Sequence, residues 1–197
     1  LSIGCYWDSH DQRCHFFDVH TLEATVQAFV TLQPLLVSFN GIAFDFPLMR
    51  GLLRQEADAS DLRSGTGQAE QTRGAALHHL CDAFKALCAR SYDILAEIWQ
   101  VDPTRKFERG LNSLGALSEA NGLGAKRSHG AQAPRDWMNR LYAQVVNYCQ
   151  DDVWKTKALF EMVCAGQPIL RGDGRPIVLP QPSMMENRGT PDCDRRP

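Results

Sequence analysis

The sequence lacks several features that would place it in a familiar class of protein. No apolar run approaches the roughly 18–20 residues that a membrane-spanning helix requires, so we expect no association with a membrane. No two of the seven cysteines are spaced Cys-x-x-Cys, which argues against a structural zinc site. Reduced cysteines fit a cytoplasmic protein best. Neither of the glycine-rich phosphate-binding patterns is present, which leaves a nucleotide-binding α/β enzyme as only the third-ranked interpretation.

The chain also has no large excess of charge. Its net charge of −2 over 197 residues argues against a surface that coats nucleic acid broadly. The charge is unevenly distributed, however, because residues 105–135 contain six basic and two acidic residues. A basic segment in an otherwise acidic chain suits a protein that binds an anion at one place, although a solvated loop could have the same composition.

Strand-like and helix-like patterns alternate along the chain, which predicts an α/β layer fold. A hairpin is expected from two short apolar strands, and a helix capped by Thr21 follows, ended by Gln33-Pro34. A buried strand and another helix come next. Later helices, and a hairpin near the end, complete the pattern. The expected ranges are strands at 1–6, 13–17 and 35–39; helices at 21–33, 46–54, 75–89, 111–122 and 136–163; and a hairpin at 167–179.

Two segments are predicted to lie outside the packed core. Residues 57–74 are poor in large apolar side chains, and we interpret them as an exposed excursion rather than a domain boundary. Residues 183–197 have little apolar content, and we expect them to be disordered. The sequence therefore predicts one domain over residues 1–182, followed by a tail.

The first stretch with chemical potential joins a strand to a helix. The apolar strand runs into Asn40, and Asp45 follows at the expected helix start. A carboxylate beyond a strand end and beside a helix N-terminus lies where α/β folds bind ligands. A purely structural interpretation is also open: Asp45 could cap the helix and Asn40 could form the turn.

The second stretch lies in a late helix. Tyr148 and Asp152 are four residues apart and so share a helical face, on the same side as Leu141, Val145 and Leu159. A carboxylate on an inward face must be paired or bound to a metal ion. An arginine partner in a structural helix is the alternative to a metal. Asp151 should point elsewhere, as a solvated neighbour.

Together, and in this order, the two stretches resemble a known nuclease pattern. Asn-x-x-x-Phe-Asp after a strand, at residues 40–45, is similar to the second motif of the DEDD-superfamily 3′→5′ exonucleases. Tyr-x-x-x-Asp, at residues 148–152, is similar to the Tyr variant of their third motif. The residues at 148–156 are similar to those of bacterial ribonuclease H-like domains related to the exonuclease domain of family B DNA polymerases. Residues 91–95, with Asp93 in a strand, also fit.

This resemblance implies a fold, an activity and a set of roles. The fold would be a ribonuclease H-like three-layer α/β fold with a mixed central sheet flanked by helices. The activity would be two-metal hydrolysis of DNA or RNA from the 3′ end, with Mg²⁺ or Mn²⁺ held by carboxylates. The expected roles are metal ligands for Asp45 and Asp152, water orientation for Tyr148, and substrate contacts for Asn40, Phe44, Lys126 and Arg127.

One part of the family pattern is not found. No Asp-x-Glu strand precedes the hairpin, and this motif would supply two of the four metal carboxylates. We therefore expect the fold to miss its first, central strand and this chain to be weakly active or inactive. A degenerate module that binds nucleic acid or protein without catalysis is the main alternative. Association with helicase or polymerase machinery is a further expectation.

Overall fold

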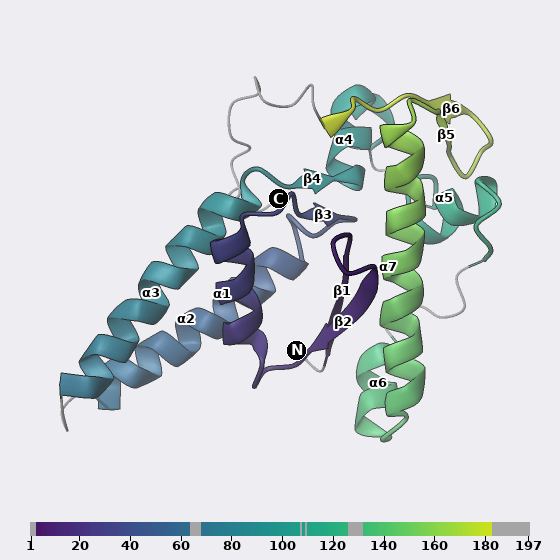
Figure 1. Cartoon of the computed structure of the whole chain (residues 1–197). Coiled ribbons are helices and arrows are strands. Elements are labelled where there is room, and N and C mark those ends of the chain that lie inside the picture. The colour runs from purple at the N-terminus through teal and green to yellow at the C-terminus, as the bar shows by residue number, and fades with distance from the viewer. Residues whose placement is uncertain (1–2, 64–67, 107, 109, 126–131, 183–197) are drawn as a thin grey trace.

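A computed structural model of the protein describes residues 3–63, 68–106, 108, 110–125 and 132–182 (Figure 1). The tail predicted at 183–197 lies outside these residues. The strands are β1 (Gly4–Asp8), β2 (Arg13–Phe17), β3 (Val37–Ser38), β4 (Tyr92–Asp93), β5 (Ile169–Leu170) and β6 (Pro176–Ile177). The helices are α1 (Leu22–Leu32), α2 (Asp45–Arg63), α3 (Gln68–Cys88), α4 (Ile94–Val101), α5 (Leu114–Ala120), α6 (Ala133–Met138) and α7 (Tyr142–Cys164), with a 3-10 turn at Pro103–Arg105.

The antiparallel β1–β2 hairpin lies between two helices (Figure 1). Successive strand residues point to opposite faces, so Tyr6 and Trp7 pack in opposite directions. Tyr6 packs edge-on against Phe29 of α1, with 4.9 Å between ring centroids. Trp7 packs against Trp154 of α7 at 4.6 Å. Helix, strands and helix therefore form three layers, as predicted.

Strands β3 and β4 form a second, parallel pair, in which Val37 lies opposite Tyr92 and Ser38 opposite Asp93. Both an antiparallel and a parallel pair are thus present, as a mixed sheet requires. Among the described residues these pairs are separate two-stranded sheets, because β1 and β3 are not hydrogen-bonded to each other. The predicted strand at 35–39 is shortened to two residues.

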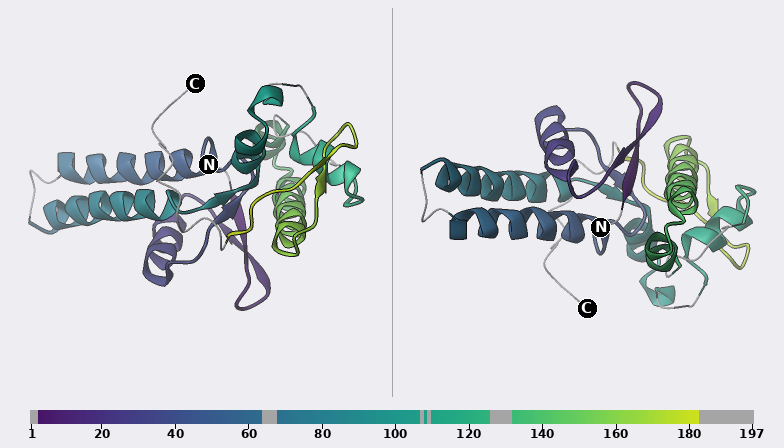
Figure 2. Two further views of the ribbon diagram at one scale, coloured as in Figure 1. Left: turned by 90° about the horizontal axis from the view of Figure 1, so that it is seen from above. Right: turned by 90° about the horizontal axis from the view of Figure 1, so that it is seen from below.

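Helices α2 and α3 form the crossover between β3 and β4 and project together away from the rest of the molecule (Figure 2). The described part of residues 57–74 does project from the molecule and is largely exposed, as predicted, but it is helical, because α2 extends to Arg63 and α3 begins at Gln68. The two helices pack through small residues, among them Ala57 and Ser60, which are fully buried.

The C-terminal half is built around α7, which runs alongside the hairpin and contacts β3 (Figure 1). The sequence predicted a helix from Asp136 that continued into a second stretch. In the structure, α6 ends at Met138, and Arg140 adopts a left-handed conformation (φ 61°) before α7 begins. Helix α1 also differs in detail, because Thr21 makes no capping hydrogen bond and instead bonds to Asp18.

Two hydrophobic clusters stabilise the fold. One joins the hairpin residue Phe17 to α1, α2 and α3, and the other joins β4 and α4 to α5, α7 and the β5–β6 hairpin. The β3–α2 turn lies where the two clusters meet, between α2 and β4. In the described part of the chain, no helix is long and apolar enough to cross a bilayer. The six cysteines in that part are free thiols.

Candidate active site

The turn between β3 and α2 carries the first predicted motif. Asn40 adopts a left-handed conformation (φ 67°), which Asn tolerates better than most residues. Gly41 leaves no room for a side chain, because an added Cβ would lie 2.6 Å from the Cβ of Ser38. The amide of Phe44 donates to the carbonyl of Asn40 at 3.1 Å. Asp45 then begins α2, so the structural role expected for Asn40 is present alongside any functional one.

Phe44 and Asp45 are both accessible to solvent at this turn. The Phe44 side chain is 63% exposed, which is unusual for a large aromatic residue. Asp45 is exposed as a residue, although the protein partly shields its carboxyl group from solvent. An accessible acidic residue beside an exposed aromatic ring is compatible with the predicted roles in binding a cation and a nucleotide.

Asp93 ties this turn to β4, and it was not among the residues assigned to the site from sequence. Its side chain is 2% exposed. Its Oδ1 accepts from the amide of Asn40 at 3.0 Å, and its Oδ2 accepts from the amide of Ile42 and the hydroxyl of Ser38, also at 3.0 Å. Its Oδ1 also accepts from the Ala96 amide and so caps α4. The sequence showed a carboxylate within residues 91–95. It could not show the hydrogen-bond partners of this carboxylate, because they are distant in sequence.

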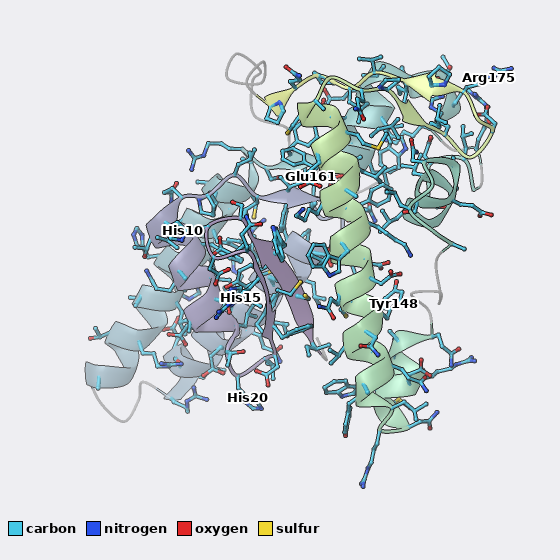
Figure 3. The ribbon with its side chains drawn as sticks, turned by 45° about the vertical axis from the view of Figure 1, so that its right-hand side comes forward. His10, His15, His20, Tyr148, Glu161 and Arg175 are labelled. Carbon is cyan, nitrogen blue, oxygen red and sulfur yellow. The ribbon has the colours of Figure 1, made fainter. Side chains whose placement is uncertain are left out.

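The second predicted motif lies on α7, which carries Tyr148 (Figure 3). The spacing of Tyr148 and Asp152 puts them on the helical face of the buried Val145 and Leu159. The hydroxyl of Tyr148 is hydrogen-bonded to Asp152. Burial, this hydrogen bond and the Asp152 charge raise the pKa of Tyr148 above its usual range. The residue therefore keeps its proton at neutral pH and can act as a hydrogen-bond donor.

The electrostatics of Asp45 connect the two motifs. Loss of solvent around the carboxyl, followed by the negative charges of Asp93 and Asp152, raises the pKa of Asp45 to about 6. Like charges disfavour ionisation, so Asp93 of β4 and Asp152 of α7 both lie within electrostatic range of Asp45 of α2. The metal-binding roles of Asp45 and Asp152 stay predictions.

Cys149 also lies in this region and was not predicted as part of it. Burial and then the charges of Asp152 and Asp45 raise the pKa of its thiol to about 11. The thiol is therefore neutral at physiological pH, and a neutral thiol is a poor nucleophile and metal ligand. The chemistry of this site thus depends on its oxygen atoms.

Asp151 does not behave as the solvated neighbour that the sequence indicated. Its carboxylate forms an ion pair with Lys155, one helical turn later. Lys155 is 4% exposed and also donates to the carbonyl of Ala125 at 3.1 Å. A buried cation needs such partners, so Asp151 and Ala125 together hold the inner face of α7 against the segment ending at residue 125.

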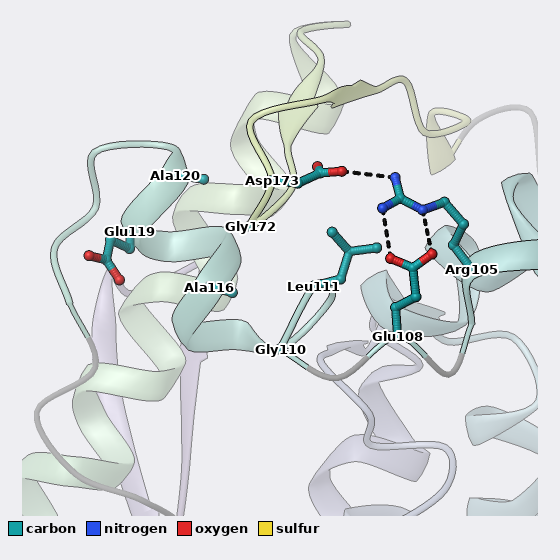
Figure 4. Close-up of a pocket in the computed structure, with 9 residues that line it drawn as sticks. All are labelled: Arg105, Glu108, Gly110, Leu111, Ala116, Glu119, Ala120, Gly172 and Asp173. Atoms are coloured by element: carbon teal, nitrogen blue, oxygen red, sulfur yellow. Dashed lines mark hydrogen bonds and ion pairs between the residues drawn. The ribbon is translucent and has the colours of Figure 1, made fainter.

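The basic segment is only partly available for binding an anion. Arg105 pairs with Glu108 at 2.7 Å and with Asp173 at 2.9 Å, at one side of a surface pocket (Figure 4). The positive charge of Arg105 is therefore paired with carboxylates of the protein itself. Lys126 and Arg127, the two predicted phosphate contacts, lie outside the described residues, so that prediction is untested.

The donor chemistry at Asp45 and Asp152 suits a hard divalent cation such as Mg²⁺ or Mn²⁺, which prefers carboxylate oxygens. The negative charges of Asp93 and Asp152 contribute, after loss of solvent, to the raised pKa of Asp45, and a bound cation would offset these charges. Among the described residues, two groups bring three possible ligand atoms within 4.8 Å of one another: Asp8, Asp11 and His15 on the hairpin, and Asp58, Asp61 and His78 on α2 and α3. Neither contains a residue of this site.

Comparison with protein families agrees with this arrangement. The RNase_H_2 family model, of the RNase H superfamily, matches residues 2–164, which include both motifs and the crossover between them. Comparisons with curated proteins and with solved structures give no match. The match covers most of the chain and agrees with a three-layer α/β structure that joins carboxylates from distant elements. The chain therefore belongs to the RNase H superfamily and is a nuclease-type domain.

Proposed function

We propose that this chain is a metal-dependent 3′→5′ exonuclease-type domain of the Tyr variant, acting on the 3′ end of DNA or RNA. The observation that supports the proposal is the link between the two motifs: Asp152, which is hydrogen-bonded to Tyr148, also acts electrostatically on Asp45. These two motifs are more than 100 residues apart in sequence, so the link between them comes from the fold.

Asp45 and Asp152 would hold Mg²⁺ or Mn²⁺. When bound, the cation would polarise the phosphate and the attacking water and so lower the barrier to hydrolysis. The donor set fits this role, because it consists of carboxylate oxygens, and because the neighbouring Cys149 remains a neutral thiol. Two carboxylates fall short of the four in the related exonucleases, so we expect weak binding and slow turnover by this chain.

The remaining residues would bind and orient the substrate. Tyr148, protonated and hydrogen-bonded to Asp152, would orient the attacking water. Phe44 offers an exposed ring on which the terminal base could stack, a contact that typically contributes about 1–3 kcal/mol. Asn40 would support the turn and contact the terminal nucleotide. Lys126 and Arg127 would contact phosphates, and helicase or polymerase machinery would supply the substrate.

The test is digestion of 5′-labelled DNA and RNA oligonucleotides in the presence of Mg²⁺ or Mn²⁺. We expect products shortened one nucleotide at a time from the 3′ end, with the protein in excess because turnover is slow. EDTA and Asp152→Ala should abolish the products. Tyr148→Phe should slow their appearance by about 10²-fold, as expected for the loss of one group that orients the nucleophile.

Asp82→Asn provides the matched control, since Asp82 is an exposed carboxylate on α3, away from the motifs. It should leave the rate unchanged. Internal cuts, or cleavage that persists in EDTA, would contradict the proposed activity. Binding of the oligonucleotide without any cleavage, also by a longer version of the protein, would instead support a non-catalytic module.

A further inference from the structure

We infer that Asp93 is a positioning residue of this site: it clamps the β3–α2 turn, so that Asn40 and Asp45 are held in place for substrate and cation. This inference deepens the proposed function and rests on it for the identity of the ligand. The clamp itself is a property of the ligand-free protein. It is carried by hydrogen bonds between segments that lie far apart in the sequence.

The Asp93 carboxylate accepts four hydrogen bonds. Three of its donors belong to one short segment, the Ser38 hydroxyl and the amides of Asn40 and Ile42, all at 3.0 Å. The fourth is the amide of Ala96, at 3.1 Å. Each oxygen therefore accepts two bonds, so all of its lone pairs are used.

Because its lone pairs are all used by hydrogen bonds, Asp93 is not expected to be a metal ligand itself. A carboxylate whose oxygens already accept four hydrogen bonds, at 2% exposure, has no lone pair left for a cation. Asp45, in contrast, is exposed to solvent. The two carboxylates are close enough for Asp93 to affect the ionisation of Asp45, yet they face different partners.

A helix cap alone does not account for this arrangement. Ser113 caps α5 in the ordinary way, by accepting one bond from the Ala116 amide three residues later. Asp93 does the same for α4 and also accepts bonds from residues 51 to 55 positions earlier in the chain. These additional bonds have no capping function. They fix the backbone of a turn that contains a left-handed Asn40.

The clamped residues are linked directly to the start of α2. The Phe44 amide bonds to the Asn40 carbonyl, and the Phe46 amide bonds to the Gly41 carbonyl at 2.9 Å. Asp45 lies between these two donors. Movement of Asn40 or Ile42 would therefore move Asp45, which is why loss of the Asp93 clamp should affect the site without touching its ligands.

The test compares Asp93→Asn with wild type by hydrogen exchange and by Mn²⁺ binding. An asparagine keeps the volume and one acceptor, but its amide group cannot accept from the Ile42 amide. In EDTA, we expect exchange of the Asn40 and Ile42 amides to accelerate by about tenfold or more, as for the loss of one or two hydrogen bonds. Mn²⁺ binding, measured by calorimetry, should weaken by a similar factor, and Ser38→Ala, which keeps the Asp93 charge that acts on Asp45, should weaken it too.

Ser113→Ala is the matched control, because it removes a helix cap from α5 without touching the turn. It should lower the unfolding midpoint while leaving Mn²⁺ affinity and exchange at Asn40 and Ile42 unchanged. Equal Mn²⁺ affinity and equal exchange in Asp93→Asn and wild type would overturn the inference. If Asp93→Asn does not fold, Ser38→Ala removes a single donor and should still accelerate exchange in the turn; no acceleration would overturn the inference equally.

The hydrogen-exchange measurement and the Mn²⁺-binding measurement test this inference and the proposed function separately. If wild type binds Mn²⁺ no better than Asp45→Asn does, the proposed metal site is wrong, and exchange in EDTA still decides whether the clamp exists. If wild type binds Mn²⁺ and Asp93→Asn binds it equally well, the proposed function stands and the positioning role is wrong.

Discussion

At the scale of single residues, the site is defined by a carboxylate that is costly to ionise. Loss of solvent around its carboxyl group, and then the charges of Asp93 and Asp152, raise the pKa of Asp45 to about 6 from the usual 3.8. Its charge is therefore unfavourable in the ligand-free protein. Such conflicts between stability and charge are typical of functional sites, where a ligand relieves them.

The first prediction concerns the pH dependence of stability. A folded-state pKa raised above the unfolded value means that Asp45 supports folding fully only below about pH 4, and that this contribution is lost as the pH rises through about 6. Asp45→Asn should therefore become more stable than wild type as the pH rises. The gain should be about 1 kcal/mol above pH 7, once solvent screening of this accessible group is allowed for.

Urea denaturation in EDTA at several pH values between 4 and 8 measures this difference in unfolding free energy. The gain should grow between about pH 4 and 6 and then level off. Asp82→Asn, on an exposed part of α3, should show no such growth. A difference between Asp45→Asn and wild type that is constant across this range would contradict the raised pKa of Asp45.

At the scale of elements, the sequence predicted helices and strands best where large apolar residues mark one face. Leu22 and Val26 identified α1, and Val145 and Leu159 identified the inner face of α7. The helical structure within residues 57–74 was missed because α2 and α3 meet there through small residues, such as Ser60, which carry no hydrophobic signal.

The site was predicted in part for the same reason. Asp45, Tyr148 and Asp152 follow local patterns, either after a strand or on one helical face, which a single sequence reveals. The role of Asp93 depends on hydrogen bonds to residues more than 50 positions away. Such contacts are set by the parallel pairing of β3 with β4 and leave no local pattern.

The close packing of α2 and α3 gives the second prediction, which compares two glycines. An alanine in place of Gly51 of α2 has open space around its Cβ, so Gly51→Ala should stabilise the protein by about 1 kcal/mol through helix propensity. At Gly74 of α3, the Cβ would lie 1.9 Å from Oδ1 of Asp61. Asp61 would have to leave its contact with His78 Nε2, at 3.0 Å.

Gly74→Ala should therefore gain clearly less than Gly51→Ala, or lose stability. Thermal unfolding of the two variants and of wild type makes the comparison directly, because both substitutions add the same methyl group to a helix. Equal stabilisation by the two would show that α2 and α3 are less closely packed at Gly74 than in this structure.

At the scale of the whole molecule, the strands are divided between the two hydrophobic clusters. The antiparallel β1–β2 pair packs between α1 and α7, and the parallel β3–β4 pair joins the crossover helices to α4. Each pair is bonded only internally among the described residues. Strand edges without a partner are costly when they are buried.

The third prediction follows from these edges and from the missing Asp-x-Glu motif. A longer version of the protein, in which an upstream strand carries Asp-x-Glu, should pair with β1 and β3 and supply two further carboxylates. The added ladder hydrogen bonds should raise the unfolding midpoint by at least about 5 °C. Metal-dependent removal of 3′ nucleotides should rise at least about 100-fold, because the cation would gain ligands that this chain lacks.

A longer version in which both acidic residues are replaced by Asn and Gln separates the two effects. This variant should keep the gain in unfolding midpoint and lose the gain in activity, because the strand supplies stability and its carboxylates supply chemistry. If the 197-residue chain alone trims 3′ ends robustly and loses this activity on Asp152→Ala, its site is sufficient without Asp-x-Glu, and the prediction of a missing central strand is wrong.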